Sequence, residues 1–257
     1  MKIFFLILVS TNVFAEMDRS LRSIPVGVAS PSSWDAVTSN PGAISPSKQW
    51  LGSAQVLPKV WGQYEHYLRV GASKGAGPVG GALAIGRSLC SSPTTEVFGG
   101  VGLWANDNLS LGVGGHFPVN STFGSEKRLT TSLRYSNGWT AFTLLWDSLE
   151  SGSARSRIIT GVTLLGTFAD IAIDVRTPLL EDLRGLDEKY EVALSAAFTI
   201  GKTASFYGRV AYPVILEWDS QLPMWRGGLQ LTMTPQTNCG AFVEKYGIVG
   251  ANCQMIF

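Results

Sequence analysis

The chain has 257 residues, of which 15% are charged and 45% are apolar, and its 20 basic residues nearly balance its 19 acidic ones. This balance argues against a nucleic-acid partner, which favours a basic face, and the low charged fraction argues against a soluble enzyme surrounded by charged helices. The 29 glycines and the many aromatic residues argue against a disordered chain, so the composition suits a protein that exposes little surface to water.

The first fifteen residues predict a secretory signal peptide. Lys2 precedes an apolar core at residues 3–9, and Val13 and Ala15 occupy positions −3 and −1 before Glu16. The alternative is a short membrane anchor, but a spanning helix needs about 20 apolar residues and this run is far shorter. We therefore expect cleavage after Ala15 and an exported mature protein, in a compartment that permits disulfides.

Residues 16–47, here called the lead-in segment, contain Pro25, Pro31, Pro41 and Pro46, which prevent any long regular element. We expect this segment either in the periplasm or folded into the lumen of the structure that follows.

From residue 48 to the end, apolar and polar residues alternate with a period of two, which predicts β-strands with one apolar face. No comparable stretch has the spacing of an amphipathic helix. Fourteen strands are predicted, with twelve as an alternative, near 49–57, 64–73, 78–89, 96–105, 109–118, 127–136, 139–148, 155–165, 168–177, 189–200, 203–215, 224–234, 239–244 and 248–257.

The lengths of the strands and links indicate a membrane barrel. Most predicted strands have the ~9–11 residues of a tilted transmembrane strand rather than the ~5–6 of a soluble sheet. Short and longer links alternate along the chain, as in outer-membrane barrels. The short links are 74–77, 106–108, 137–138, 166–167, 201–202 and 235–238, and the longer ones are 119–126, 150–154, 178–188 and 216–223. We expect an all-β fold, a closed antiparallel barrel over residues 48–257 in the lipid of a Gram-negative outer membrane. A soluble jelly roll is the alternative.

Alternation assigns charged residues of both signs to the lumen face. The candidates that line the lumen are Arg128, Arg134, Asp147, Arg157, Asp170, Asp174, Arg176, Glu191, Arg209 and Arg226. One interpretation is a polar channel whose charges set its selectivity. The other is a plugged barrel held by internal ion pairs, with the inward glycines Gly100, Gly102, Gly112 and Gly114 leaving room for the lead-in segment.

Residues for catalysis or metal binding are scarce. His66 and His116 are the only histidines, neither has an evident partner in the sequence, and there is no Cys-x-x-Cys pair. The glycine runs lack the helix and the Lys-Ser/Thr ending of a phosphate-binding loop. We expect no enzyme activity, no cofactor and no metal.

The last hairpin predicts a disulfide. A three-residue turn at 245–247 places Glu244 opposite Ile248 and therefore Cys239 opposite Cys253, within reach of a disulfide, and leaves Cys90 unpaired. A two-residue turn would point the two sulfur atoms to opposite faces. The alternative is three buried free thiols.

Two segments resemble known families. The alternating final strand ends in Phe257 and resembles the C-terminal signal that the assembly machinery of outer-membrane barrels reads. The stretch around Asn40, Pro41 and Gly42 resembles the Asn-Pro-Ala-Gly-Leu segment of fatty-acid-transporter-like barrels and their secretion-associated relatives. Here Gly42-Ala43 inverts the order of the small residues and the chain is shorter, and a simple Asn-Pro turn is the other interpretation.

The resemblance to fatty-acid-transporter-like barrels implies fourteen strands and an N-terminal segment inserted in the lumen. It also implies passive transport, or a channel, for small or hydrophobic solutes. The alternative function is a non-transporting barrel that tethers a periplasmic or surface protein partner; a nucleic-acid partner is not expected.

Overall fold

The computed structural model describes residues 27, 29, 31, 36–37, 39–57, 67–88, 94–119, 127–149, 157–178, 190–201, 203–214, 224–244 and 248–257. The predicted signal peptide at 1–15, His66, Cys90 and the predicted turn at 245–247 lie outside the described residues.

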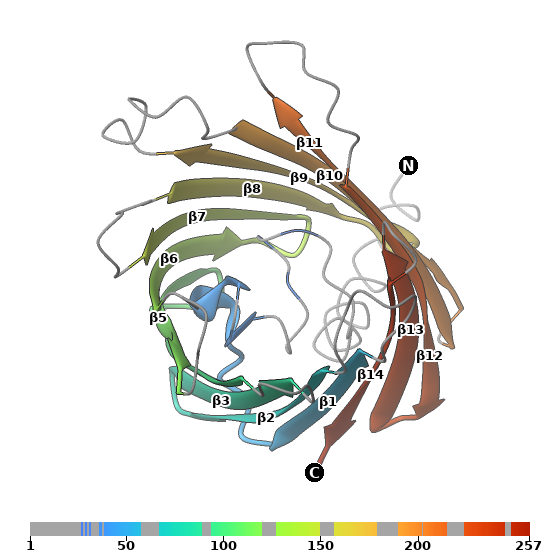
Figure 1. Cartoon of the computed structure of the whole chain (residues 1–257), viewed down its shortest axis with the longest axis horizontal. Helices are drawn as coiled ribbons and strands as arrows, with labels where there is room; N and C mark the ends of the chain where they lie inside the picture. Colours follow the sequence, from blue (N-terminus) through green and yellow to red (C-terminus); the bar gives the residue numbers. More distant parts are fainter. Residues whose placement is uncertain are drawn as a thin grey trace, which may run out of the picture.

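Fourteen antiparallel strands close into one barrel, in which each strand pairs with its neighbours in sequence and β1 pairs with β14 (Figure 1). The strands are β1 (Leu51–Leu57), β2 (Tyr67–Ala76), β3 (Val79–Ser88), β4 (Thr95–Trp104), β5 (Leu109–Pro118), β6 (Arg128–Ser136), β7 (Thr140–Leu149), β8 (Arg157–Leu165), β9 (Ala169–Pro178), β10 (Tyr190–Ile200), β11 (Ala204–Val214), β12 (Met224–Thr234), β13 (Thr237–Glu244) and β14 (Ile248–Ile256). The predicted count of fourteen is confirmed.

Apolar side chains cover the outside of the barrel. In β9, Ile171 and Ile173 are half exposed on the outer face, while Asp170, Ala172 and Asp174, which alternate with them, are buried inside. The same alternation runs through the other strands, since a strand points successive side chains to opposite faces. The result is a wall with an apolar exterior and a polar, small-residue interior.

Exposed aromatic residues gather near both ends of the barrel. Near the end with the short links lie Trp50, Trp139, Phe168 and Phe257, and near the opposite end lie Phe117, Trp146, Tyr212 and Trp225. Two such belts flank the apolar band of membrane barrels, where aromatic rings sit at the lipid–water interfaces.

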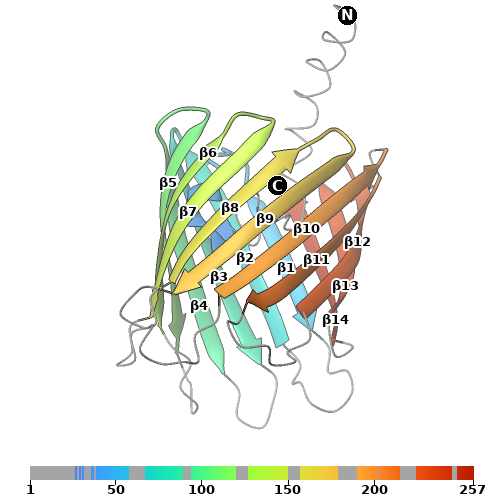
Figure 2. The same cartoon turned by 90° about the horizontal axis from the view of Figure 1, so that it is seen from above.

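The short links are hairpin turns at one end of the barrel, the upper end in Figure 2. The prediction placed the first of them at 74–77, but β2 continues to Ala76 and only Gly77 and Pro78 lie outside the strands. Gly77 has a φ of +60°, which suits the first central position of a tight hairpin turn, so the reversal occurs at the glycine and not at Lys74.

The seam between β1 and β14 closes the ring. Their register pairs Leu51 with Ile256, and the Phe257 amide donates a hydrogen bond to the Trp50 carbonyl at 2.9 Å. The Phe257 ring lies against Gly52, where an added Cβ would come within 2.8 Å of it. The last residue of the chain is thus held on the first strand.

The described part of the lead-in segment lies inside the ring, where Figure 1 shows its blue ribbon beside β5. It includes a short 3-10 helix, η1 (Pro41–Ala43), which contacts β4, β5 and β6. Within the described ranges, no helix has the length and apolar character needed to cross a membrane.

Candidate functional site in the barrel lumen

A row of glycines on the inner wall makes room for the lead-in segment. The glycine seat consists of Gly75, Gly80, Gly100, Gly102, Gly112 and Gly114, on β2 to β5. A Cβ on Gly112 would collide with Gly42 and Pro41, and a Cβ on Gly102 would lie 2.8 Å from the Pro41 carbonyl oxygen. The lead-in segment therefore approaches the backbone of the sheet more closely than would be possible with any larger residue at the glycine positions.

Polar side chains of the wall hold the segment in place. Ser110 Oγ donates to the Gly42 carbonyl at 2.6 Å, and the Gly42 amide donates to Ser132 Oγ at 2.7 Å. Asn40 Nδ2 donates to Thr143 Oγ1 at 3.1 Å, and Trp104 Nε1 donates to the Ile44 carbonyl at 2.9 Å. The bonds to Gly42 and Ile44 satisfy backbone groups that would otherwise be buried without partners. The motif residues Asn40, Pro41 and Gly42 are all buried at this point.

The charged residues predicted to line the lumen fall into separate groups. Arg134 contacts the lead-in segment, because its Nε donates to the Ala29 carbonyl at 2.9 Å. Asp174 is buried next to Gly27, whose added Cβ would lie 3.0 Å from Asp174 Oδ1. Asp170 is buried and accepts from the Gly166 amide at 3.0 Å, which fixes the turn between β8 and β9. Arg128 is exposed where β6 begins.

The remaining candidates lie together on β7 to β12, toward the end of the barrel where the longer links attach. This arginine group comprises Arg157, Arg176, Arg209 and Arg226, with the carboxylates of Asp147 and Glu191. Arg176 Nη1 lies 3.5 Å from Glu191 Oε2, and Arg209 Nη2 lies 3.8 Å from Glu191 Oε1.

The register explains how the arginine group forms. It places Arg176 opposite Glu191, Asp147 opposite Arg157, and Arg209 opposite Arg226. Arg226 also stacks over Phe242, with its Cζ 4.7 Å from the ring centroid. Residues from six consecutive strands, β7 to β12, thus lie along one stretch of the inner wall.

A second polar cluster, on β2 to β5, was not predicted. Tyr67 OH donates to Glu96 Oε2 at 3.0 Å, and His116 Nε2 lies 3.4 Å from Glu96 Oε1. The His116 ring stacks on Phe98 with centroids 4.6 Å apart. His116 therefore has a partner, contrary to the expectation from sequence. The register of β4 and β5, which sets Phe98 opposite His116, is the feature from which this contact could have been predicted.

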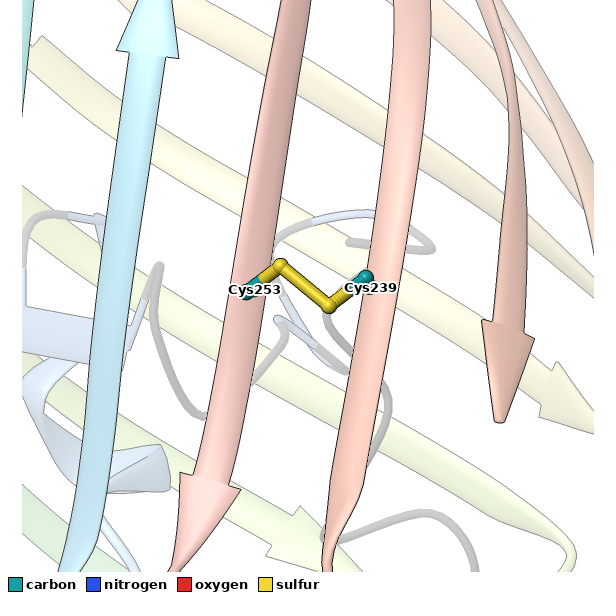
Figure 3. Close-up of a disulfide and its surroundings, with 2 residues drawn as sticks. All are labelled: Cys239 and Cys253. Carbon is teal, nitrogen blue, oxygen red and sulfur yellow. A yellow bond between two sulfur atoms is a disulfide. The ribbon is translucent and has the colours of Figure 1, made fainter. Parts of the chain in front are cut away.

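The two cysteines of the last hairpin face each other. The register pairs Glu244 with Ile248 and Cys239 with Cys253, and the structure joins the two sulfur atoms in a disulfide (Figure 3). Ala241, Val243, Val249 and Ala251 are exposed on the same outer face of these two strands.

Nothing in the described residues points to a metal site, because no three His, Cys, Asp or Glu side chains come together there in a suitable arrangement. The arrangement instead offers fixed charges and hydrogen-bond donors along an inner wall. These can orient or attract a solute.

Comparison with known proteins supports the fold. No family model matches the chain, and no curated protein matches it. The structure is similar to the crystal structure of Omp33, an outer membrane protein of Acinetobacter baumannii, with a TM-score of 0.52 and 12% sequence identity over 82% of this chain and 99% of that one. A triple mutant of Rhodopseudomonas blastica porin aligns with a TM-score of 0.49 and 9% identity over 81% of this chain and 99% of that one. At these identities the likeness to Omp33 concerns the closed β-barrel fold, and the resemblance to fatty-acid-transporter-like barrels stays a prediction.

Proposed function

We propose that this chain is an outer-membrane channel through which small polar solutes pass without an energy source. The observation that carries the proposal is the contrast between the two faces of one wall. The outer face is apolar between two aromatic belts, and the inner face of β7 to β12 carries the arginine group. Charges are costly beside lipid unless they face water or a partner, so an inner wall of this kind suits a wet lumen.

The charged inner wall favours polar solutes over hydrophobic ones. A path for hydrophobic molecules would benefit from apolar side chains along the lumen, whereas Arg176, Glu191 and Arg209 present charge there. Export by a signal peptide and insertion by the assembly machinery, which would read the last strand and Phe257, belong to the same proposal.

A non-transporting barrel is the second candidate. The observation in its favour is the lead-in segment, which is hydrogen-bonded to Ser110, Ser132 and Thr143 and packed on the glycine seat. A segment held so closely fills part of the lumen. A barrel filled across its whole section would serve as a scaffold for a periplasmic or surface partner.

Planar-bilayer recording of the full mature chain tests the channel. We expect discrete conductance steps for the wild type and larger steps for Gly112→Val, since a valine there collides with Gly42 and displaces the lead-in segment. Gly208→Val is the matched control, because an added Cβ at Gly208 meets nothing within 4 Å. Heat-modifiable migration on a gel verifies that each variant is folded.

The outcomes separate the two candidates. A silent wild type that conducts only as Gly112→Val would favour the sealed scaffold. No conductance from either folded protein would contradict the channel.

A further inference from the structure

We propose that the arginine group is a binding site for small oxyanions, meaning solutes that carry a phosphate or carboxylate group, on their way through the lumen. This inference rests on the proposed channel and names the class of solute that it takes.

The local charge balance is positive. Arg176 and Arg209 share the single carboxylate of Glu191, so one unit of positive charge remains among the three side chains. Arg157 and Arg209 both repel Arg176 electrostatically, and Asp147 and Glu191 attract it. Like charges this close on one face of a sheet are unfavourable unless a counter-charge lies among them.

The register places a further arginine, Arg226, beside Arg209. Arg209 and Arg226 stand directly opposite each other on β11 and β12, both on the inner face. Directly opposed like charges destabilise an antiparallel pair. The same register sets Glu244 opposite Arg226 on β13, so we assign the anion site to Arg176 and Arg209, around Glu191.

Hydrogen-bond donors remain available for such an anion. The Nε atoms of Arg176 and Arg209 are buried and have no hydrogen-bond partner among the described residues. The distances to Glu191, 3.5 and 3.8 Å, exceed the ~2.7–2.9 Å of a charge-assisted hydrogen bond, so the carboxylate leaves donor capacity unused. The guanidinium fork matches the oxygens of phosphate and carboxylate groups.

The site is also reachable from the lumen. The side chains of Arg176 and Arg209 are 35% and 34% exposed, and that of Glu191 is 29% exposed. All three have inward positions in strands whose other face is apolar, so a ligand would come from the aqueous interior and not from lipid.

Reversal potentials across a KCl gradient in planar bilayers test the site. We expect chloride to permeate better than potassium in the wild type, and Arg176→Gln or Arg209→Gln to lower the chloride-to-potassium permeability ratio roughly threefold, because each removes one charge from the lumen wall. Glu191→Gln should raise the ratio, since it removes the competing carboxylate. Arg87→Gln is the matched control, because Arg87 is exposed on the outer face of β3 and should leave the ratio unchanged.

Inorganic phosphate provides a readout that needs no conductance. At constant ionic strength, phosphate in place of chloride should raise the temperature at which the detergent-solubilised barrel loses its folded gel band. This should hold for the wild type, Glu191→Gln and Arg87→Gln, but not for Arg176→Gln or Arg209→Gln. Stabilisation by phosphate with no conductance would support the oxyanion site and contradict the channel.

The reverse combination overturns the inference. Conductance with equal permeability ratios in the wild type and the two arginine variants, together with no specific effect of phosphate, would leave the channel standing and show that the arginine group is a set of structural ion pairs.

Discussion

Ile173 and Asp174 are neighbours in β9 with opposite environments. Ile173 is 49% exposed on the outer face, and Asp174 is 3% exposed on the inner face beside Gly27. In a membrane the first faces hydrocarbon and the second faces the lumen, so a charge has very different effects at the two positions.

We expect Ile173→Arg to lower the free energy of unfolding by about 2–4 kcal/mol, as an arginine near the middle of the lipid face does in barrels of this kind. Asp174→Asn keeps the shape of the side chain and should cost much less. Urea titration of the barrel in lipid vesicles measures both. Equal losses at the two positions would mean that β9 is buried on both faces, as in a soluble sandwich.

Single residues also show which contacts could not be predicted from the sequence. Alternation was sufficient to assign Arg176 and Glu191 to the inner face, because the period of a strand is two. It could not show that Glu191 is shared with Arg209, or that His116 contacts Glu96, because these contacts depend on the register of neighbouring strands and the reach of long side chains.

The last hairpin, β13 and β14, is the element whose register was predicted from sequence. A three-residue loop and the alternation of the flanking residues allowed one register that keeps the apolar side chains on one face, and the structure has that register.

The contacts of the lead-in segment with the glycine seat could not be predicted in the same detail. Inward glycines indicated space, but the bonds from Ser110, Ser132 and Trp104 come from three strands distant from the segment in sequence.

Peptide mapping without reductant tests the hairpin. We expect one linked pair of peptides that contains Cys239 and Cys253, because their Cα atoms are 4.1 Å apart across the two strands. A Cys90→Ser variant should give the same linked pair, and its agreement with the wild type excludes exchange with the third thiol. Recovery of both C-terminal cysteines as free thiols from fresh membranes would contradict the pairing.

For the whole molecule, the even number of strands sets the orientation. The start of β1, the end of β14 and the short links that follow β2, β4, β6, β8, β10 and β12 lie at the same end of the barrel. Short turns face the periplasm in outer-membrane barrels, so the longer links should face the outside of the cell.

Labelling of intact cells tests this orientation. In a Cys90→Ser background, we expect an impermeant thiol reagent to modify Leu183→Cys, in the predicted 178–188 link, and to leave Asn137→Cys, in a hairpin turn, unmodified. The opposite pattern would invert the orientation of the barrel.

The overall architecture was the part most fully predicted from sequence. The length of a strand follows from the thickness of a bilayer, and the alternation of side chains follows from the geometry of a strand. Both features can therefore be read in most of the strand sequences of the barrel. The contents of the lumen follow from contacts between distant segments, and for that reason the arginine group emerged only with the structure.

The seam between β1 and β14 has a consequence for how the molecule is made. The ring cannot close until its final nine-residue strand has been synthesised and has found the first strand. Because the lead-in segment runs directly into β1, it must already be inside when that contact forms, or it would have to enter a finished cylinder. Closure of the barrel therefore depends on one long-range contact, the pairing of β14 with β1, next to which the Phe257 amide bonds to the Trp50 carbonyl.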